Sequence, residues 1–506
     1  MHQGAAPSML WGSLRPGPYA VGYRAEWARD LSRTWRLTPR AGVRFMPDSV
    51  GRPVRVTVWY PAAAGTRSVL MRFGDYTRVE APGAFVDFAR RLDQRDRNAV
   101  AAMVRPNEVA GLLALPMVAY HEPVPAPGRF PLVLVVAGLN AEATAQVVLA
   151  EFLASYGYVV AVVAWTGVNE EQFDATRTPT GIEATLRDVE MAWSLLRTRP
   201  DVDPGRLAVV GHSLGGVIAV LAAMRNGDVG AVVGLDATYG FASAADALTG
   251  FYAFAPRNMV VPLLDVRRAA GEQGAALDLG AEHAFTYSDR TFVTLHNIRH
   301  SEFSSYALIA SATHQSPLPS DRVTPGWSRE TASVRYQQAT RLVLDFLDAK
   351  LKGDSSGVTR LAAEAAGSPG AVLSHEAAAP LPMSATELVT LAGARGFDAA
   401  VDRLRHDVAD AGTSAAVDVA ALNALGYSLL GQQRAHDAVN AFHLVVIADS
   451  TSANAFDSYG DGLSAAGRAA DACTAYAKAL ALAPSDTTLS AADRDALVTA
   501  ETGRHC

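Results

Sequence analysis

Short runs of apolar residues recur through the first two thirds of the chain, with longer segments of helical periodicity between them. The runs are rich in β-branched residues and too short for helices, so each predicts a strand. They lie at 131–137 (PLVLVVA), 158–164 (YVVAVVA), 207–210 (LAVV), 231–235 (AVVGL), 259–266 (MVVPLLDV) and 291–296 (TFVTLH). Most are unbroken, as expected of strands covered on both faces of a parallel sheet. With helical segments at 181–200 and 333–354, the pattern predicts a doubly wound, mostly parallel α/β sheet.

Four segments depart from this pattern. Residues 54–60 alternate and stop at Pro61, which predicts a strand near the sheet edge. Residues 1–30 are rich in Gly and Pro and are expected to be irregular. Residues 64–129 predict a helical excursion between early strands, which we expect to line the substrate pocket together with the aromatic segment 238–258. Residues 353–382 are small, polar and contain Pro, which predicts a linker between an α/β domain at 1–352 and a further domain at 383–506.

The last domain contains a repeat. Four residues recur 34 positions further on: Gly426, Leu429, Ala438 and Phe442 reappear as Gly460, Leu463, Ala472 and Tyr476. A period of 34 with small and aromatic residues at these places resembles the tetratricopeptide repeat, a helix pair in which small residues allow close contact. The sequence therefore predicts an all-α domain. Three roles stay open for it: docking on the first domain, self-association, or binding of a protein partner.

The motif that organises the chain is GHSLGG at 211–216. The predicted strand 207–210 precedes it and a helical segment follows, and a G-x-S-x-G turn between strand and helix is the nucleophile elbow of an α/β-hydrolase. Gly211 and Gly215 fit a turn so sharp that side chains on either side of the serine would collide. We therefore expect Ser213 to be the nucleophile.

A serine hydroxyl needs a base to take its proton, and the base needs an acid to orient it. In an α/β-hydrolase the acid and then the histidine follow the nucleophile along the chain. His300 follows the last predicted strand and is the expected base. His296 lies nearer the strand and is interpreted as structural, while His283 falls in a loop and His314 lies later still.

Two residues are candidates for the acid. Asp236 ends the strand after the elbow helix, and Asp265 ends the next one. Fold logic alone favours Asp265, because the acid of most α/β-hydrolases follows the later strand. The residues by themselves leave both open.

The chain from about residue 52 to residue 348 resembles the plasma-type platelet-activating-factor acetylhydrolases and their bacterial dienelactone-hydrolase-like relatives. The likeness lies in VTVWYPA at 56–62, GRFPLVLVVAGLN at 128–140, GHSLGG at 211–216, GLDA at 234–237 and HSEF at 300–303. It implies an α/β-hydrolase with Asp236 as the acid, and Asp265 as the alternative. It also implies that the Leu139 amide completes an oxyanion hole with the amide of Leu214, which follows the nucleophile. Relatives often carry histidine where this chain has Ala137, which affects substrate preference.

These residues predict a serine carboxylesterase that acts on a small-molecule ester and needs neither a metal nor a cofactor. A serine peptidase or amidase shares the machinery and stays an alternative. A protein of another class, in which the repeats bind a partner and the hydrolase domain is a scaffold, is the third interpretation. It is disfavoured by the full set of nucleophile, acid, base and oxyanion candidates in the right order.

Bulk composition excludes some partners and leaves others open. The chain has 506 residues, a net charge of −7 and no long charge runs, so nucleic acid is not an expected partner. No apolar run reaches the roughly 18 residues of a membrane span. The N-terminus lacks the features of a signal peptide, so the compartment is cytoplasmic, or periplasmic or secreted if a leader has been removed. Cys473 and Cys506 are either free thiols or one disulfide.

Overall fold

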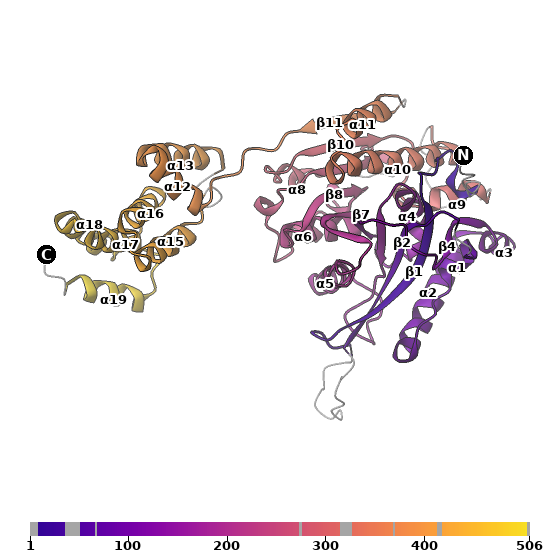
Figure 1. Ribbon diagram of the computed structural model, residues 1–506, viewed down its shortest axis with the longest axis horizontal. Helices are drawn as coiled ribbons and strands as arrows, with labels where there is room; N and C mark the ends of the chain where they lie inside the picture. Colours follow the sequence, from indigo (N-terminus) through magenta and orange to yellow (C-terminus); the bar gives the residue numbers. More distant parts are fainter. Residues whose placement is uncertain are drawn as a thin grey trace. The chain divides into compact units, whose positions relative to one another are not determined.

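A computed structural model describes residues 9–35, 51–65, 68–272, 276–313, 326–367, 370–411 and 417–502. The chain divides into two compact units, Met1–Ala379 and Pro380–Cys506. The first unit contains one large sheet with helices on both of its faces, and the second consists of helices (Figure 1). The α/β-hydrolase fold and the C-terminal helical region expected from the sequence are confirmed.

An 11-stranded sheet, in the order β11-β10-β9-β8-β7-β5-β6-β2-β1-β4-β3, forms the first unit. The strands are β1 (Ala20–Asp30), β2 (Arg52–Ala62), β3 (Leu70–Arg72), β4 (Pro116–His121), β5 (Phe130–Val136), β6 (Val159–Val163), β7 (Val202–His212), β8 (Val229–Leu235), β9 (Leu263–Arg268), β10 (Arg290–Leu295) and β11 (Ala371–Glu376). The six neighbours from β10 to β6 pair in parallel. Five of them contain one of the predicted apolar runs or most of it, and those predictions are confirmed. Strand β9 contains only the second half of the run at 259–266, because it begins at Leu263.

Alternating residues of the central strands contribute side chains to two separate hydrophobic cores, one on each face of the sheet. On one face, Val133 and Val135 of β5 pack with α4 (Val147–Ser155) and α10 (Arg329–Leu351). On the other, Leu132 and Leu134 pack with α5 (Pro179–Leu196) and α6 (Leu214–Arg225). Because both faces are covered, the strands are apolar at successive positions, and parallel strands direct their carboxyl ends to one edge.

The expectation for residues 1–30 is wrong, because Ala20–Asp30 form strand β1 along the whole length of β2. The sequence of β1 carries an alternating signal, with Val21 and Tyr23 buried and Arg24 and Glu26 at polar positions, which the Gly and Pro residues before it obscure. Strand β2 is consequently not at the edge, since β1, β4 and β3 lie beyond it.

The linker expected at 353–382 also needs correction. It contains α11 (Ser356–Ala366), which packs on α10, and β11, which pairs antiparallel with β10. Strand β11 is mostly exposed, including Val372 and Leu373, so its short apolar stretch does not report burial and did not distinguish it from a linker. The excursion at 64–129 is mostly helical, as expected, with α1 (Phe73–Thr77), α2 (Val86–Met103) and α3 (Val109–Leu113), but it also contributes β3 and β4 to the sheet.

The second unit is a series of helix pairs. Its described helices are α12 (Ala385–Arg395), α13 (Phe397–Ala411), α15 (Val419–Gly431), α16 (Ala435–Ala448), α17 (Ala453–Ala465), α18 (Ala469–Leu482) and α19 (Ala491–Thr502). The 34-residue repeat has a structural counterpart, because Gly426 lies against the ring of Phe442 and Gly460 against the ring of Tyr476. A Cβ atom at either glycine would lie within 2.4 Å of a ring carbon, so only glycine allows this approach of the paired helices.

Two further expectations concern membranes and cysteines. Within the part of the chain that the structure describes, no helix combines the length and apolar character needed to cross a bilayer. Cys473 is disulfide-bonded, whereas Cys506 lies outside the described residues.

Candidate active site

Ser213 sits on a tight turn between the last residue of β7 and the first residue of α6. Its backbone is held at φ 56° and ψ −125°, a conformation that few non-glycine residues adopt. A Cβ atom at Gly215 would lie 2.1 Å from the carbonyl oxygen of Val136, and one at Gly211 would lie 2.1 Å from that of Gly215. The two glycines therefore permit the turn, which presents the Ser213 side chain at the carboxyl edge of the sheet.

His300 joins Ser213 to Asp236. The Nε2 atom of His300 lies 2.8 Å from Ser213 Oγ, and its Nδ1 atom lies 2.5 Å from Asp236 Oδ2. The carboxylate is fully buried, whereas the His300 side chain is 37% exposed. The structure thus brings together three residues that are 23 and 64 positions apart in sequence, in the order serine, acid, histidine.

Asp236 follows the last residue of β8, at a backbone φ of 45°. Its amide donates a hydrogen bond to the carbonyl of Val266 in β9, at 2.7 Å. The carboxylate accepts hydrogen bonds from the Arg268 amide at 3.0 Å and from the Arg268 guanidinium at 2.8 Å. Asp236 is therefore held from the neighbouring strand by both the main chain and a charged side chain. Sequence reasoning did not single out Arg268.

Asp265, the alternative acid, lies elsewhere. It is not at the end of its strand, since β9 continues to Arg268 and Asp265 pairs in register with Gly234 inside β8. Its buried carboxylate forms an ion pair with Arg267 at 3.2 Å, and Arg267 also bonds to Glu282 at 2.7 Å. Burial and the charge of Asp265 raise the pKa of Glu282 well above its usual range. Asp265 thus belongs to a buried ionic cluster, and it is Asp236 that contacts His300.

The loop after β5 lies against the elbow. A Cβ atom at Gly138 would be 3.5 Å from Ser213 Cβ. Asn140 holds this loop to the segment after β6 through two hydrogen bonds with the main chain of Ala175, at 3.0 and 2.8 Å. Leu139 therefore lies beside the nucleophile, as the expected oxyanion role requires, and Leu214 begins α6 directly after it. Among the described residues, neither amide has an acceptor that would compete with an oxyanion.

His212 is a second histidine of the site that the sequence reasoning missed. It is 7% exposed, and its Nε2 atom lies 2.9 Å from the main-chain oxygen of His300. The two rings are 5.1 Å apart. Burial and the charge of His300 lower the pKa of His212 to about 4, so the ring is neutral near pH 7 and donates its Nε2 proton to that oxygen. Its position inside the motif, directly before the nucleophile, was a signal for such a role.

The segment after His300 is attached to the segment that follows the loop after β5. The Tyr306 hydroxyl donates a hydrogen bond to Glu142 at 2.6 Å, and the Ser305 amide donates one to the carbonyl of Ala145 at 2.7 Å. Burial raises the pKa of Glu142. These contacts hold the loop of His300 over the start of α4, so the position of the histidine does not depend on its own short segment alone.

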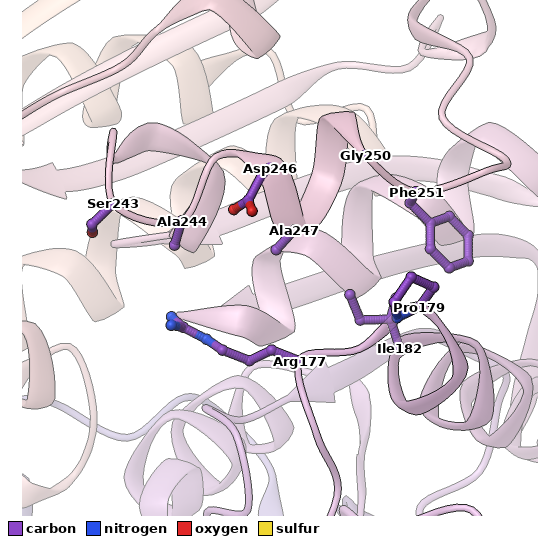
Figure 2. Close-up of a pocket in the computed structure, with 9 residues that line it drawn as sticks. All are labelled: Arg177, Pro179, Ile182, Ser243, Ala244, Asp246, Ala247, Gly250 and Phe251. Carbon is purple, nitrogen blue, oxygen red and sulfur yellow. The ribbon is translucent and has the colours of Figure 1, made fainter.

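A cavity of about 410 Å³ lies between the start of α5 and the segment that follows Asp236 (Figure 2). Its two ends differ in chemistry. Arg177 and Asp246 are at one end, and Phe251 packs with Pro179 and Ile182 at the other. Several lining residues belong to 238–258, the segment expected to shape the pocket. The excursion at 64–129 lines a different hollow, against β1.

The segments that contribute the cavity's lining residues begin close to the elbow and to the loop after β5. The Thr238 amide, on the segment after Asp236, donates a hydrogen bond to the carbonyl of Ser213 at 3.0 Å. Two residues before Arg177, the main chain of Ala175 accepts one hydrogen bond from Asn140 in the loop after β5 and donates another to it. Among the described residues, no group of three or more His, Cys, Asp or Glu side chains is arranged to hold a metal ion.

Residues 118–250 match the family model of the dienelactone hydrolase family. This stretch includes the loop after β5, the elbow and Asp236, and His300 lies beyond it. No curated protein matches the chain. Solved structures do, with 555 matching chains. One is a ferulic acid esterase from Streptomyces cinnamoneus, with 20% sequence identity over 70% of this chain and 94% of that chain, and a TM-score of 0.47. The family match and the sheet topology identify an α/β-hydrolase fold and support an ester hydrolase.

Proposed function

We propose that the protein is a serine hydrolase that cleaves carboxylic esters through an acyl-enzyme, with Ser213 as nucleophile, His300 as base and Asp236 as acid. The observation that carries the proposal is the continuous chain of hydrogen bonds from the Ser213 hydroxyl through both nitrogens of His300 to a buried carboxylate. A serine without such a partner is a poor nucleophile at neutral pH. The strained backbone of Ser213 has a use in this proposal, because it exposes the hydroxyl at the edge of the sheet.

The reaction follows from the positions of these groups. Ser213 Oγ attacks the ester carbonyl while His300 Nε2 takes its proton, and Asp236 stabilises the imidazolium that forms. The amides of Leu139 and Leu214 bind the oxyanion of the tetrahedral intermediate. His300 then gives the proton to the leaving alcohol, which leaves an acyl group on Ser213. A water molecule that loses its proton to the same nitrogen hydrolyses this acyl-enzyme.

The cavity between the start of α5 and the segment after Asp236 is the proposed site for the part of the ester that does not react. Its apolar end, at Phe251 and Ile182, suits a short acyl chain or a small ring. The resemblance to platelet-activating-factor acetylhydrolases makes a short-chain phospholipid ester a further substrate to test. Replacing Ile182 by Trp would fill this end, so the ratio of kcat/KM for butyrate over acetate esters should fall.

The test of the enzyme is hydrolysis of p-nitrophenyl acetate and butyrate by the wild type and by Ser213→Ala. The variant should lose nearly all activity, by a factor on the order of 10⁴ or more. Equal rates for the two proteins would end the proposal. The acid is tested by Asp236→Asn and Asp265→Asn. The first should lose about 10⁴-fold in kcat through a wrong histidine tautomer, and the second should keep its kcat if it folds.

For the second unit we propose a short tetratricopeptide-like array that serves self-association or binding of a protein partner. The support is the 34-residue repeat, with the same glycine-to-ring contact in two successive helix pairs. A chain that ends at residue 379 should keep its esterase activity. The apparent masses of the truncated and full chains are compared by gel filtration, after correction for the mass of the removed unit. If the truncated chain then elutes at half the apparent mass of the full chain or less, the helices mediate self-association. If its activity disappears while it stays folded, the helices serve the active site instead.

A further inference from the structure

The carboxylate of Asp236 has an unusual environment for a group that must be ionised. It is fully buried, so water does not stabilise its charge and the protein must supply the groups that do. It receives three hydrogen bonds, from the Arg268 amide, the Arg268 guanidinium and His300 Nδ1. The guanidinium is a permanent charge 2.8 Å from Oδ2, the same oxygen that faces the histidine.

We propose that Arg268 is a positioning residue of the catalytic triad: its guanidinium balances the charge of the buried Asp236 carboxylate and aims that carboxylate at His300. This inference rests on the proposed function, because it assigns Arg268 a task only if His300 acts as the base. Nothing in the elbow motif or in the order of the triad along the chain requires an arginine at this place.

The chemical reason lies in the tautomer of the histidine. An ionised Asp236 can only accept, so it holds the proton of neutral His300 on Nδ1 and leaves Nε2 free to take the proton of Ser213. If Asp236 carried a proton itself, that proton would be donated to Nδ1, and the histidine proton would move to Nε2. In that form Nε2 faces Ser213 with a proton already bound, and general base catalysis stops.

The fold fixes Arg268 for this task. It is the last residue of β9, and β8 and β9 pair in parallel up to Leu235 and Val266. Asp236 continues that ladder through its amide, which brings its side chain beside the end of β9. The guanidinium is also covered by the ring of Phe241, with 4.3 Å between its central carbon and the ring centroid. Arg268 itself is 9% exposed, so solvent screens the pair little.

The adjacent Arg267 shows that the position of an arginine along β9 decides which carboxylate it pairs with. Arg267 points to the other face of the strand and forms ion pairs with Asp265 and Glu282 in the buried cluster. Side chains of consecutive strand residues alternate between the faces, so only every second residue at the end of β9 can reach Asp236. The two arginines therefore serve two separate carboxylate sites.

Arg268→Gln and Arg268→Lys test the proposal. Both keep the main-chain hydrogen bond to Asp236, so they change the side chain alone. The Gln variant, which has no charge, should lose about 10- to 1000-fold in the plateau kcat for p-nitrophenyl acetate at little change in KM. The Lys variant should recover most of that loss, because it restores the charge. Arg225→Met is the matched control, since it removes an arginine ion pair at the far end of α6, and it should leave kcat unchanged.

A second readout does not depend on turnover. The proton between His300 Nδ1 and an ionised Asp236 should give a strongly downfield proton NMR signal, which the wild type and the Lys variant show and the Gln variant loses. Arg268→Met is the second neutral variant if the Gln variant does not fold. A folded neutral variant with the wild-type plateau kcat and the wild-type signal overturns the proposal. If the wild type shows the signal but hydrolyses esters no faster than Ser213→Ala, the proposed function is contradicted. In that case the loss or persistence of the signal in the neutral Arg268 variants alone decides whether Arg268 positions Asp236.

Discussion

Replacing His212 by Gln should make the protein less sensitive to acid. The imidazole is buried, and its Nε2 atom donates to the main-chain oxygen of His300 at 2.9 Å. The amide nitrogen of Gln can reach a similar position and donate the same hydrogen bond, but it does not bind a proton. The substitution therefore removes the titration while it keeps the contact that supports the loop of His300.

The sign and size of the effect follow from the pKa of His212. Burial lowers it from an ordinary value of 6.5 to about 4, so between these values the unfolded chain binds a proton that the folded protein does not. The free energy of unfolding must then fall as the pH falls from 6.5 to 4 and level off below that. The full loss is about 3.4 kcal/mol, at roughly 1.4 kcal/mol for each pH unit, and about 2.5 kcal/mol of it occurs between pH 7.5 and pH 4.5.

Urea unfolding at these two pH values is followed by tryptophan fluorescence. All seven tryptophans lie between residues 11 and 327, so the signal reports the stability of the first unit alone. Other carboxylates and histidines titrate in both proteins, so the quantity to compare is the difference between wild type and variant. The wild type should lose about 2.5 kcal/mol more than His212→Gln. His121→Gln, at an exposed histidine, is the matched control. If wild type and His212→Gln lose the same stability, the buried ring does not resist protonation and the reasoning is refuted.

Two glycines give further predictions. In Gly215→Ala the new methyl group would lie 2.1 Å from a main-chain oxygen of β5, so the elbow must distort. We expect a loss of about 3 kcal/mol by tryptophan fluorescence and no measurable esterase activity, while Gly227→Ala, where no atom lies within 4 Å of the new methyl, stays near wild type. In Gly460→Ala the methyl would meet the Tyr476 ring at 2.2 Å. The second unit should lose about 1–3 kcal/mol in a circular dichroism melt, with the tryptophan transition unchanged, and Gly431→Ala should not destabilise it. A Gly460→Ala protein as stable as its control would mean that the ring moves aside freely.

The central sheet was predictable because buried parallel strands leave a strong local signal. The apolar runs from 131 to 296 lie wholly or partly in strands whose residues are mostly buried, and their composition reflects that burial directly. The elbow was predictable for a different reason. Its glycines have a direct steric reason, because a side chain at Gly211 would meet the main chain of Gly215 and one at Gly215 would meet the main chain of Val136 in β5.

The choice of acid could not be made from composition, because Asp236 and Asp265 both follow apolar runs on neighbouring strands. What distinguishes them is the length of β9. The strand continues past Asp265 through Val266, Arg267 and Arg268, although two consecutive arginines at its end argue against burial on any hydrophobic scale. The resemblance to known hydrolases favoured Asp236, and the structure places that residue, not Asp265, against His300.

The arginines at the end of β9 are buried because carboxylates from distant segments neutralise them. Asp236 is 32 residues before Arg268, and the same holds at β2, where buried Arg52 bonds to Asp188 across 136 residues at 2.6 Å. A hydrophobic pattern indicates which positions are buried. It does not indicate which buried charges form ion pairs, because these pairs form only when the strands assemble. A buried ionic residue therefore looks like a break in the pattern until its partner is located. In this chain the breaks at Arg268 and His212 are the places where the fold supports the candidate triad, and they are where a search for the missing functional residues should start.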